Sequence, residues 1–358
     1  MRRFLLSALT ILVLAGAATA QDKPNKEPVS FKTFDGVLIK GSFYPSAKGG
    51  NAPVVMFLHR WGQDRSKGDW EGLAKRLQDA GYAVLSFDFR GHGESKTIDP
   101  EKFWSYPPNV DFYKKKPNLK QRTIDIKEFR ETYLPYLIAD IVAARQDVDN
   151  RNDNGGCNSS NIVLIGAEEG AAVGMLWIAT EYFRESIYPV NLGRLPNAPP
   201  LPLIIQEGLR FDRAAGEDIA GAIWLSYTRT PNKISFPYPW IAKLVPKMRE
   251  QIPMWFAHGA EDTQGASDAK YMFESFLRAD RLKEKQDFTS KYAIPKTKLR
   301  GVTMLGKQEL NVEETIEKFL KRMVERRPNE AKKNRNANSA APYYIPLQLL
   351  GFDANRFP

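Results

Sequence analysis

Two patterns of hydrophobic and polar positions run along this chain, and the first begins near residue 28. Residues 29–34 and 37–44 alternate apolar and polar side chains on either side of Asp35-Gly36. Alternation with a period of two is typical of strands that are buried on one face, and Asp-Gly is a common hairpin turn. The pattern therefore predicts a β-hairpin.

The second pattern follows directly. Residues 53–58 and 83–88 are continuous apolar runs of strand length, as expected for strands buried on both faces of a parallel sheet. Between them, residues 70–80 repeat apolar side chains at helical spacing, and Gly81 marks the end of that helix. These three segments predict one strand–helix–strand unit.

The alternation of strands and helices returns in the second half of the chain. It predicts helices at 133–148, 169–182, 266–277 and 312–324, and strands at 161–165, 220–227, 253–258 and 301–305. Alternation of this kind indicates an α/β fold with a doubly wound, mostly parallel sheet, to which the opening hairpin adds an antiparallel edge.

Two segments break the alternation and are interpreted as insertions in one α/β domain spanning 28–325. Residues 96–131 are rich in aromatic, Pro and Lys side chains, and residues 184–216 contain a Pro-rich stretch. Both could cover a ligand crevice at the carboxyl edge of the sheet, or pack elsewhere as structural excursions. Residues 326–358 form a C-terminal tail that we expect to be partly disordered, because it is polar to about residue 341.

The N-terminus is typical of a secretory signal peptide. Arg2 and Arg3 precede an apolar run at 4–15, and small residues form an A-x-A cleavage site before Gln21. A membrane anchor is the alternative, but the run is shorter than the roughly 20 residues of a membrane span, and a polar leader at 21–27 follows it. We expect residues 1–20 to be removed and the mature protein to be secreted or periplasmic, and not an integral membrane protein.

Charge and cysteine content narrow the possible partners. The formal net charge of +10 becomes +8 once Arg2 and Arg3 are subtracted, which favours contact with an anionic surface such as a cell-wall polymer. Clusters such as 114–116 have no accompanying nucleic-acid motif, so a nucleic-acid partner is not expected. The single cysteine, Cys157, cannot form an internal disulfide, and its polar Gly-Asn surroundings predict a surface position.

Four short motifs, in this order, resemble landmarks of the α/β-hydrolase superfamily. They are Phe57-Leu58-His59-Arg60-Trp61-Gly62, Phe87-Asp88-Phe89-Arg90-Gly91-His92-Gly93-Glu94-Ser95, Gly166-Ala167-Glu168-Glu169-Gly170 and His258-Gly259-Ala260-Glu261-Asp262. The second is the most specific, because D-x-R-G-H-G-x-S after a buried strand is characteristic of the family's serine esterases and peptidases. The resemblance implies the α/β-hydrolase fold and a catalytic site with a degenerate triad.

The resemblance places Glu168 where the family has its nucleophilic serine, in the sharp strand-to-helix turn of the G-x-S-x-G motif. Two interpretations remain open. A carboxylate can itself attack covalently, as an aspartate does in the family's haloalkane dehalogenases and epoxide hydrolases. Alternatively, Glu168 is a helix N-terminal carboxylate stabilised by the helix dipole, without catalysis. The same resemblance places the triad acid at Asp262 and the oxyanion region at His59, Arg60 and Glu169.

The expected histidine is missing. In the family it lies beyond the last strand, and with a last strand at 301–305 this position reads Gly306-Lys307-Gln308-Glu309-Leu310. The chain has three histidines, His59, His92 and His258, each of which falls in another motif of the family. An ester formed on Glu168 would therefore have no base to activate the water that hydrolyses it.

Other candidate contacts are aromatic. Trp61, Trp104, Tyr106 and Trp240 could stack on a sugar ring or an apolar ligand, although loop packing explains such residues equally well. No metal-ligand spacing is present, and no metal or cofactor is expected.

The sequence leaves three hypotheses for function. The leading one is an exported pseudo-hydrolase with a binding or structural role in the cell envelope, whose partner is an unknown small molecule, a glycan or an envelope protein. The second is an active hydrolase of ester or amide bonds that uses Glu168 in place of serine. The third is a carbohydrate-binding envelope protein that reuses the fold.

Overall fold

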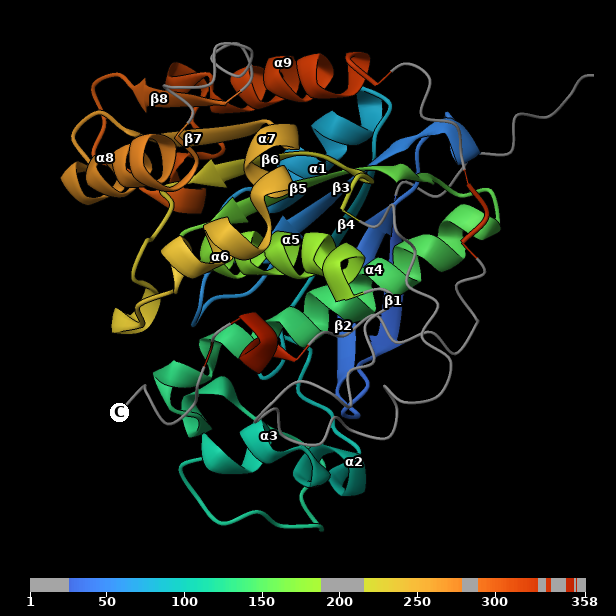
Figure 1. Cartoon of the computed structure of the whole chain (residues 1–358). Helices are drawn as coiled ribbons and strands as arrows, with labels where there is room; N and C mark the ends of the chain where they lie inside the picture. Colours follow the sequence, from blue (N-terminus) through green and yellow to red (C-terminus); the bar gives the residue numbers. More distant parts are fainter. Residues whose placement is uncertain are drawn as a thin grey trace, which may run out of the picture.

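The computed structural model describes most of the chain (Figure 1). The described residues are 26–187, 216–278, 289–327, 333–335, 346–350 and 352. The expected signal peptide and most of the second expected insertion, 184–216, lie outside them.

One mixed sheet forms the centre of the described structure. Its strands lie in the order β1-β2-β4-β3-β5-β6-β7-β8. The strands are β1 (Glu27–Lys32), β2 (Leu38–Tyr44), β3 (Pro53–Leu58), β4 (Ala83–Phe87), β5 (Asn158–Ala167), β6 (Ile219–Leu225), β7 (Met254–Gly259) and β8 (Ser290–Ile294). Strand β2 pairs antiparallel with β1 and β4, and all other pairs are parallel. The expected α/β fold with an antiparallel N-terminal hairpin is confirmed.

Helices cover both faces of the sheet, as Figure 1 shows for α4 and α5, which lie in front of it in that view. Consecutive side chains of β3 point to opposite faces: Val54 and Met56 pack with the residues of α4 and α5, whereas Val55 and Phe57 pack with those of α1 and α9. This is why β3 is apolar without interruption. The helices are α1 (Trp70–Asp79), α2 (Pro100–Ser105), α3 (Pro107–Asp111), α4 (Ile138–Asp153), α5 (Glu169–Ile187), α6 (Tyr238–Leu244), α7 (Pro246–Gln251), α8 (Thr263–Lys270) and α9 (Val312–Glu325).

Two predicted elements differ from the structure near their ends. The helix predicted at 133–148 begins as a 3-10 helix, Glu131–Leu137, which contains Pro135 and continues into α4. The helix predicted at 266–277 is α8 followed by a π-helix, η7 (Tyr271–Phe276). In both cases the helical spacing of apolar residues is retained while the hydrogen-bond pattern changes.

The strand predicted at 301–305 is wrong. Residues Gly301–Met304 form a 3-10 helix, and Gly301 has φ 51°, in the left-handed region. The last strand is β8, whose three central residues are exposed because it is the edge of the sheet. An edge strand this short and polar lacks the apolar run that marks β3 to β7.

The expected surface position of Cys157 is also wrong. Its side chain is fully buried, and its Sγ lies 3.5 Å from the carbonyl oxygen of Val148 on α4. The polar turn between α4 and β5 is on the surface, but the chain re-enters the core immediately before β5. Packing of Cys157 against α4 therefore decides its exposure, and the polarity of its neighbours does not.

The first insertion, between β4 and α4, is built on its aromatic residues. Phe103, Phe112 and Phe129 are buried and contact neighbouring rings, including a pair between Phe129 and Tyr133 with centroids 4.6 Å apart. Burial of these rings stabilises a segment that has little regular secondary structure.

The described part of the C-terminal tail is attached to the domain at two places. Arg335 forms an ion pair with Asp218 at 2.7 Å and donates a hydrogen bond to the Ser160 hydroxyl at 2.8 Å, at the start of β5. Further along, Leu347 is fully buried, and the ring of Phe352 lies 5.3 Å from that of Phe236. These C-terminal residues are part of the core.

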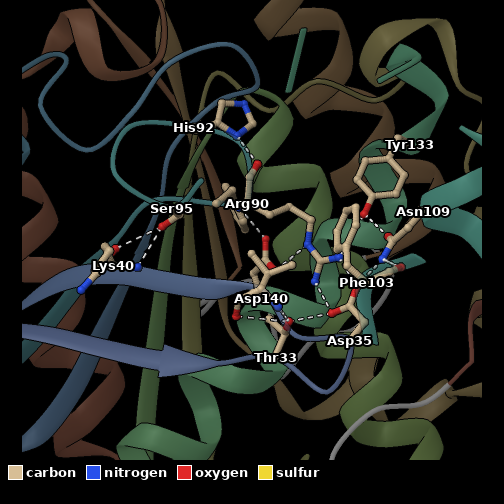
Figure 2. A network of polar contacts seen from close by, with 12 residues as sticks. Thr33, Asp35, Lys40, Arg90, His92, Ser95, Phe103, Asn109, Tyr133 and Asp140 are labelled. Atoms are coloured by element: carbon tan, nitrogen blue, oxygen red, sulfur yellow. Dashed lines mark hydrogen bonds and ion pairs between the residues drawn. The ribbon is translucent and has the colours of Figure 1, made fainter. Parts of the chain in front are cut away.

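A buried ionic network around Arg90 joins several of these elements (Figure 2). The Arg90 side chain is fully buried; its Nε donates to Asp140 on α4 at 2.7 Å, and its Nη1 donates to Asp35 in the hairpin turn at 2.6 Å. Tyr133, in the 3-10 helix before α4, and Asn109, in the first insertion, complete the network. Burial raises the pKa of Asp35, but the attraction of Arg90 and the hydrogen bonds outweigh burial and hold that pKa below its ordinary value.

We predict that Arg90→Met lowers the free energy of unfolding by about 3–5 kcal/mol, because it leaves two buried carboxylates without their cation. Urea unfolding of the purified variant measures the loss. The control is Arg76→Met, which removes a half-exposed partner of Glu317 and should cost about 0–1 kcal/mol. Equal effects of the two substitutions would contradict the role given to Arg90.

Candidate functional site

A sharp turn joins β5 to α5 at Glu168. Glu168 has φ 50°, an uncommon conformation for a residue with a side chain, and α5 begins at the next residue. Its backbone N–H donates to the carbonyl oxygen of Leu225 on β6 at 3.0 Å, which fixes the turn against the neighbouring strand. This is the geometry that exposes a nucleophile at the end of a strand in α/β hydrolases.

The two glycines that flank the turn allow close packing of backbones. A Cβ at Gly166 would lie 2.7 Å from the Cα of Ala171, and a Cβ at Gly170 would lie 2.3 Å from the carbonyl oxygen of His59. Neither position has space for any larger residue. Helix α5 can therefore approach β5 and the loop after β3 only with glycine at both positions.

Arg60 neutralises the carboxylate of Glu168. The Glu168 residue is 6% exposed, and Nη1 of Arg60 lies 3.3 Å from its Oε1 and 3.2 Å from its Oε2. Nε of Arg60 also lies 3.6 Å from Oε2 of Glu169. Burial raises the pKa of Glu168; Arg60 opposes this shift, and the negative charge of Glu169 adds to it.

A second arginine pairs with the residue at the triad-acid position. Asp262 follows β7, and its Oδ1 accepts a hydrogen bond at 2.9 Å from the backbone N–H of Gly265, at the start of α8. Its Oδ2 lies 3.3 Å from Nε of Arg300, in the loop after β8. A Cβ at the next residue, Gly301, would lie 2.6 Å from Oε1 of Glu168, so this loop runs directly against the carboxylate.

Sequence reasoning missed Arg300 because it placed the last strand too late. The last strand is β8, and residues 295–300 follow it. Among these residues, Arg300 pairs with Asp262. The expected base position lies elsewhere: Gly306 and Gln308 line a groove of about 760 Å³ between α1 and α9. Recognition of 290–294 as an edge strand before Pro295 is the signal that could have located Arg300.

All three histidines lie in the described part of the chain, and none contacts Glu168. The ring nitrogens of His59 face two backbone groups: Nδ1 lies 2.8 Å from the carbonyl oxygen of Arg60, and Nε2 accepts from the N–H of Phe89 at 2.9 Å. The Nδ1 of His258 lies 2.8 Å from the carbonyl oxygen of Gly259. These contacts are all with backbone groups, and none is with the Glu168 carboxylate.

His92 makes the same kind of contacts as His59. Its Nδ1 lies 2.9 Å from the carbonyl oxygen of Arg90 (Figure 2), and its Nε2 accepts from the N–H of Gly62 at 3.0 Å. Burial lowers the pKa of His59 to about 4 and that of His92 to about 3. The two neutral rings, 5.1 Å apart, connect the loop after β3 to the loop after β4 and so position Arg60.

The four candidate aromatic contacts lie on three separate segments. Trp61, after β3, packs edge-on against His92 at 5.7 Å. In the first insertion, Trp104 is 9% exposed and donates its Nε1–H to the carbonyl oxygen of Asn118, while Tyr106 packs against Phe34. Trp240 on α6 is 49% exposed, so its indole is far more accessible to a ligand than that of Trp104.

The described residues contain no group of three or more His, Cys, Asp or Glu side chains that could hold a metal ion. No helix among them combines the length and the apolar character needed to cross a bilayer.

The strand order, the antiparallel β2 and the turn at Glu168 define an α/β-hydrolase fold. Glu168 follows β5, Asp262 follows β7, and Arg300, after β8, pairs with Asp262.

No family model and no curated protein matches the sequence. Among solved structures, an esterase of Pyrococcus furiosus matches with 15% identity and a TM-score of 0.48, covering 83% of this chain and 90% of that chain. A dienelactone hydrolase of Anabaena variabilis matches with 15% identity and a TM-score of 0.46, covering 84% and 98%. A putative α/β hydrolase of Agrobacterium tumefaciens matches with 16% identity and a TM-score of 0.49, covering 86% and 99%.

We predict that the imidazoles of His59 and His92 do not titrate between pH 8 and about pH 5, because their pKa values lie at about 4 and about 3. Because the pKa of each buried imidazole lies below the ordinary value of 6.5, the unfolded chain binds a proton more readily than the folded protein does. The contribution of the two neutral rings to the free energy of unfolding is therefore complete above pH 6.5, and it decreases as the pH falls towards about 4 and about 3. Histidine NMR chemical shifts against pH measure this, with His92→Gln to assign the signals, and a midpoint near 6.5 for either ring would contradict it.

Proposed function

We propose that this chain is an exported, catalytically inactive protein of α/β-hydrolase fold that binds a partner in the cell envelope. One observation carries the proposal: the carboxylate at the nucleophile position is paired with Arg60, and the residue that faces the acid position is Arg300. The hydroxyl and the imidazole of a hydrolytic triad are both replaced by charged groups.

The chemistry of these groups argues against turnover. A covalent ester on Glu168 would require a general base to activate water for its hydrolysis. Arg300 cannot provide one, because a guanidinium has five N–H donors and no acceptor. Arg60 also stabilises the Glu168 carboxylate in the resting protein, which lowers its reactivity as a nucleophile.

The same groups support binding. Four buried polar atoms of the site form no hydrogen bond in the described structure: Nε of Arg60, Oε2 of Glu169, Oδ2 of Asp262 and Nε of Arg300. They face one another only as ion pairs, at 3.6 Å and 3.3 Å. Buried polar groups are normally hydrogen-bonded, so these donors and acceptors favour a polar ligand that completes their hydrogen bonds. Export rests on the signal-peptide pattern at 1–20, and attraction to an anionic envelope rests on the formal charge of +8 that remains without Arg2 and Arg3.

We predict that the purified mature protein is not labelled by a fluorophosphonate probe and hydrolyses a panel of activated esters no faster than its Glu168→Ala variant. Probe gels and initial rates measure this. The matched control is Glu309→Ala, at an exposed glutamate after β8. Turnover that Glu168→Ala abolishes and Glu309→Ala preserves would overturn the inactive assignment in favour of the Glu168 hydrolase.

We also predict that the mature protein sediments with insoluble peptidoglycan, and that the bound fraction falls several-fold as the salt concentration rises from about 0.05 M to about 0.5 M, because screening shortens the range of charge attraction. Co-sedimentation followed by gel quantification measures the bound fraction. Glu168→Ala should bind to the same extent, since the attraction comes from the whole surface. Absence of binding at low salt would contradict the envelope role, and binding that salt does not weaken would point to specific glycan recognition.

A further inference from the structure

We infer that a pocket between α6, α7 and η7 binds a small anionic ligand with an apolar body, such as an aryl phosphate or aryl carboxylate. This pocket has a volume of about 360 Å³, within the range of about 300–1,000 Å³ that holds small organic ligands. Its lining belongs to the chain that follows β6 and α8, and none of the residues at the triad positions contributes to it. The inference does not depend on the function proposed for Glu168.

The pocket walls are preformed by aromatic rings. The ring of Tyr238 contacts Tyr271 at 6.0 Å and Phe276 at 5.2 Å, both edge-on. The Tyr238 hydroxyl donates to the carbonyl oxygen of Arg229 at 2.9 Å and lies 2.8 Å from the hydroxyl of Tyr227, inside the protein. Because the polar end of Tyr238 is held inside, an apolar ligand meets the surface of rings that are already fixed in place.

The charge at the pocket is entirely positive. Lys243, Arg249 and Arg278 line it, and no carboxylate does. Within the described residues, no ion pair is formed by any of these three cations. The buried carboxylate of Asp268 is paired with Arg229, whose guanidinium stacks over Tyr271 at 4.5 Å. Three cations without partners around one concave site attract an anion.

Arg249 supplies a second, independent observation. Its Nε is buried and has no hydrogen-bond partner in the described structure. Exposed lysines and arginines are commonly unpaired because water solvates them, but a buried guanidinium nitrogen has lost that water. An anionic oxygen in the pocket would satisfy this N–H, and phosphate and carboxylate groups can each accept two parallel N–H bonds from a guanidinium.

Trp240 makes the site observable. It lies on α6, between two of the lining residues, Tyr238 and Ala242, and its indole is 49% exposed. Tryptophan fluorescence therefore offers a signal from the same helix as the pocket.

The test uses 2-naphthyl phosphate as the probe, with binding to the full mature protein measured by calorimetry and by tryptophan fluorescence. We expect saturable binding that weakens about tenfold in Arg249→Gln and in Arg278→Gln, because each removes one charged donor. Two variants are used so that poor folding of one, detected by circular dichroism, leaves the other informative. The control, Lys321→Gln, removes an exposed cation on α9 and should bind as the unchanged protein does.

Two further ligands test the chemical class. Neutral 2-naphthol and inorganic phosphate each carry half of the proposed ligand, and both should bind at least about tenfold more weakly than 2-naphthyl phosphate if the rings and the cations act together. The inference is overturned if 2-naphthyl phosphate does not bind, if Arg249→Gln and Arg278→Gln bind it as tightly as Lys321→Gln, or if either half-ligand binds as tightly as the whole.

Discussion

The fully buried guanidinium of Arg90 is the interaction on which the arrangement of this protein depends. It connects elements that are far apart in the sequence: the hairpin turn through Asp35, helix α4 through Asp140, and the 3-10 helix before α4 through Tyr133. A cation in the core is tolerated only while all of these partners are in place, so the network selects one arrangement of these elements. The loop that carries Arg90 also carries His92, which fixes the loop of Arg60, and in this way the network extends to the site.

Close packing alone requires the hydrolase-like geometry of the turn at Glu168. Its glycines are required by the close approach of α5 to β5 and to the loop after β3, whichever side chain occupies the centre of the turn. Packing therefore maintains the turn independently of catalysis. An acid at its centre then needs a cation nearby, and two arginines from different loops meet that need.

The parts of the fold that could be predicted from the sequence are those with a strong local pattern. The hairpin around Asp35-Gly36, the buried strands β3 to β7 and the amphipathic helix α9 all repeat apolar residues at a fixed period. Glu168 and Asp262 were identified because short motifs surround them. Strand β8 and Arg300 were not, because an exposed edge strand has no apolar run, and the pairing of Arg300 with Asp262 joins loops that nothing local relates.

The buried C-terminal residues have a consequence for the order of events during synthesis. Arg335 completes an ionic cluster at the start of β5, and Phe352 packs against Phe236, so the core lacks these side chains until residue 352 has been made. Closure of the core therefore comes late in synthesis, and a protein fused after residue 352 would have to leave these contacts free to form.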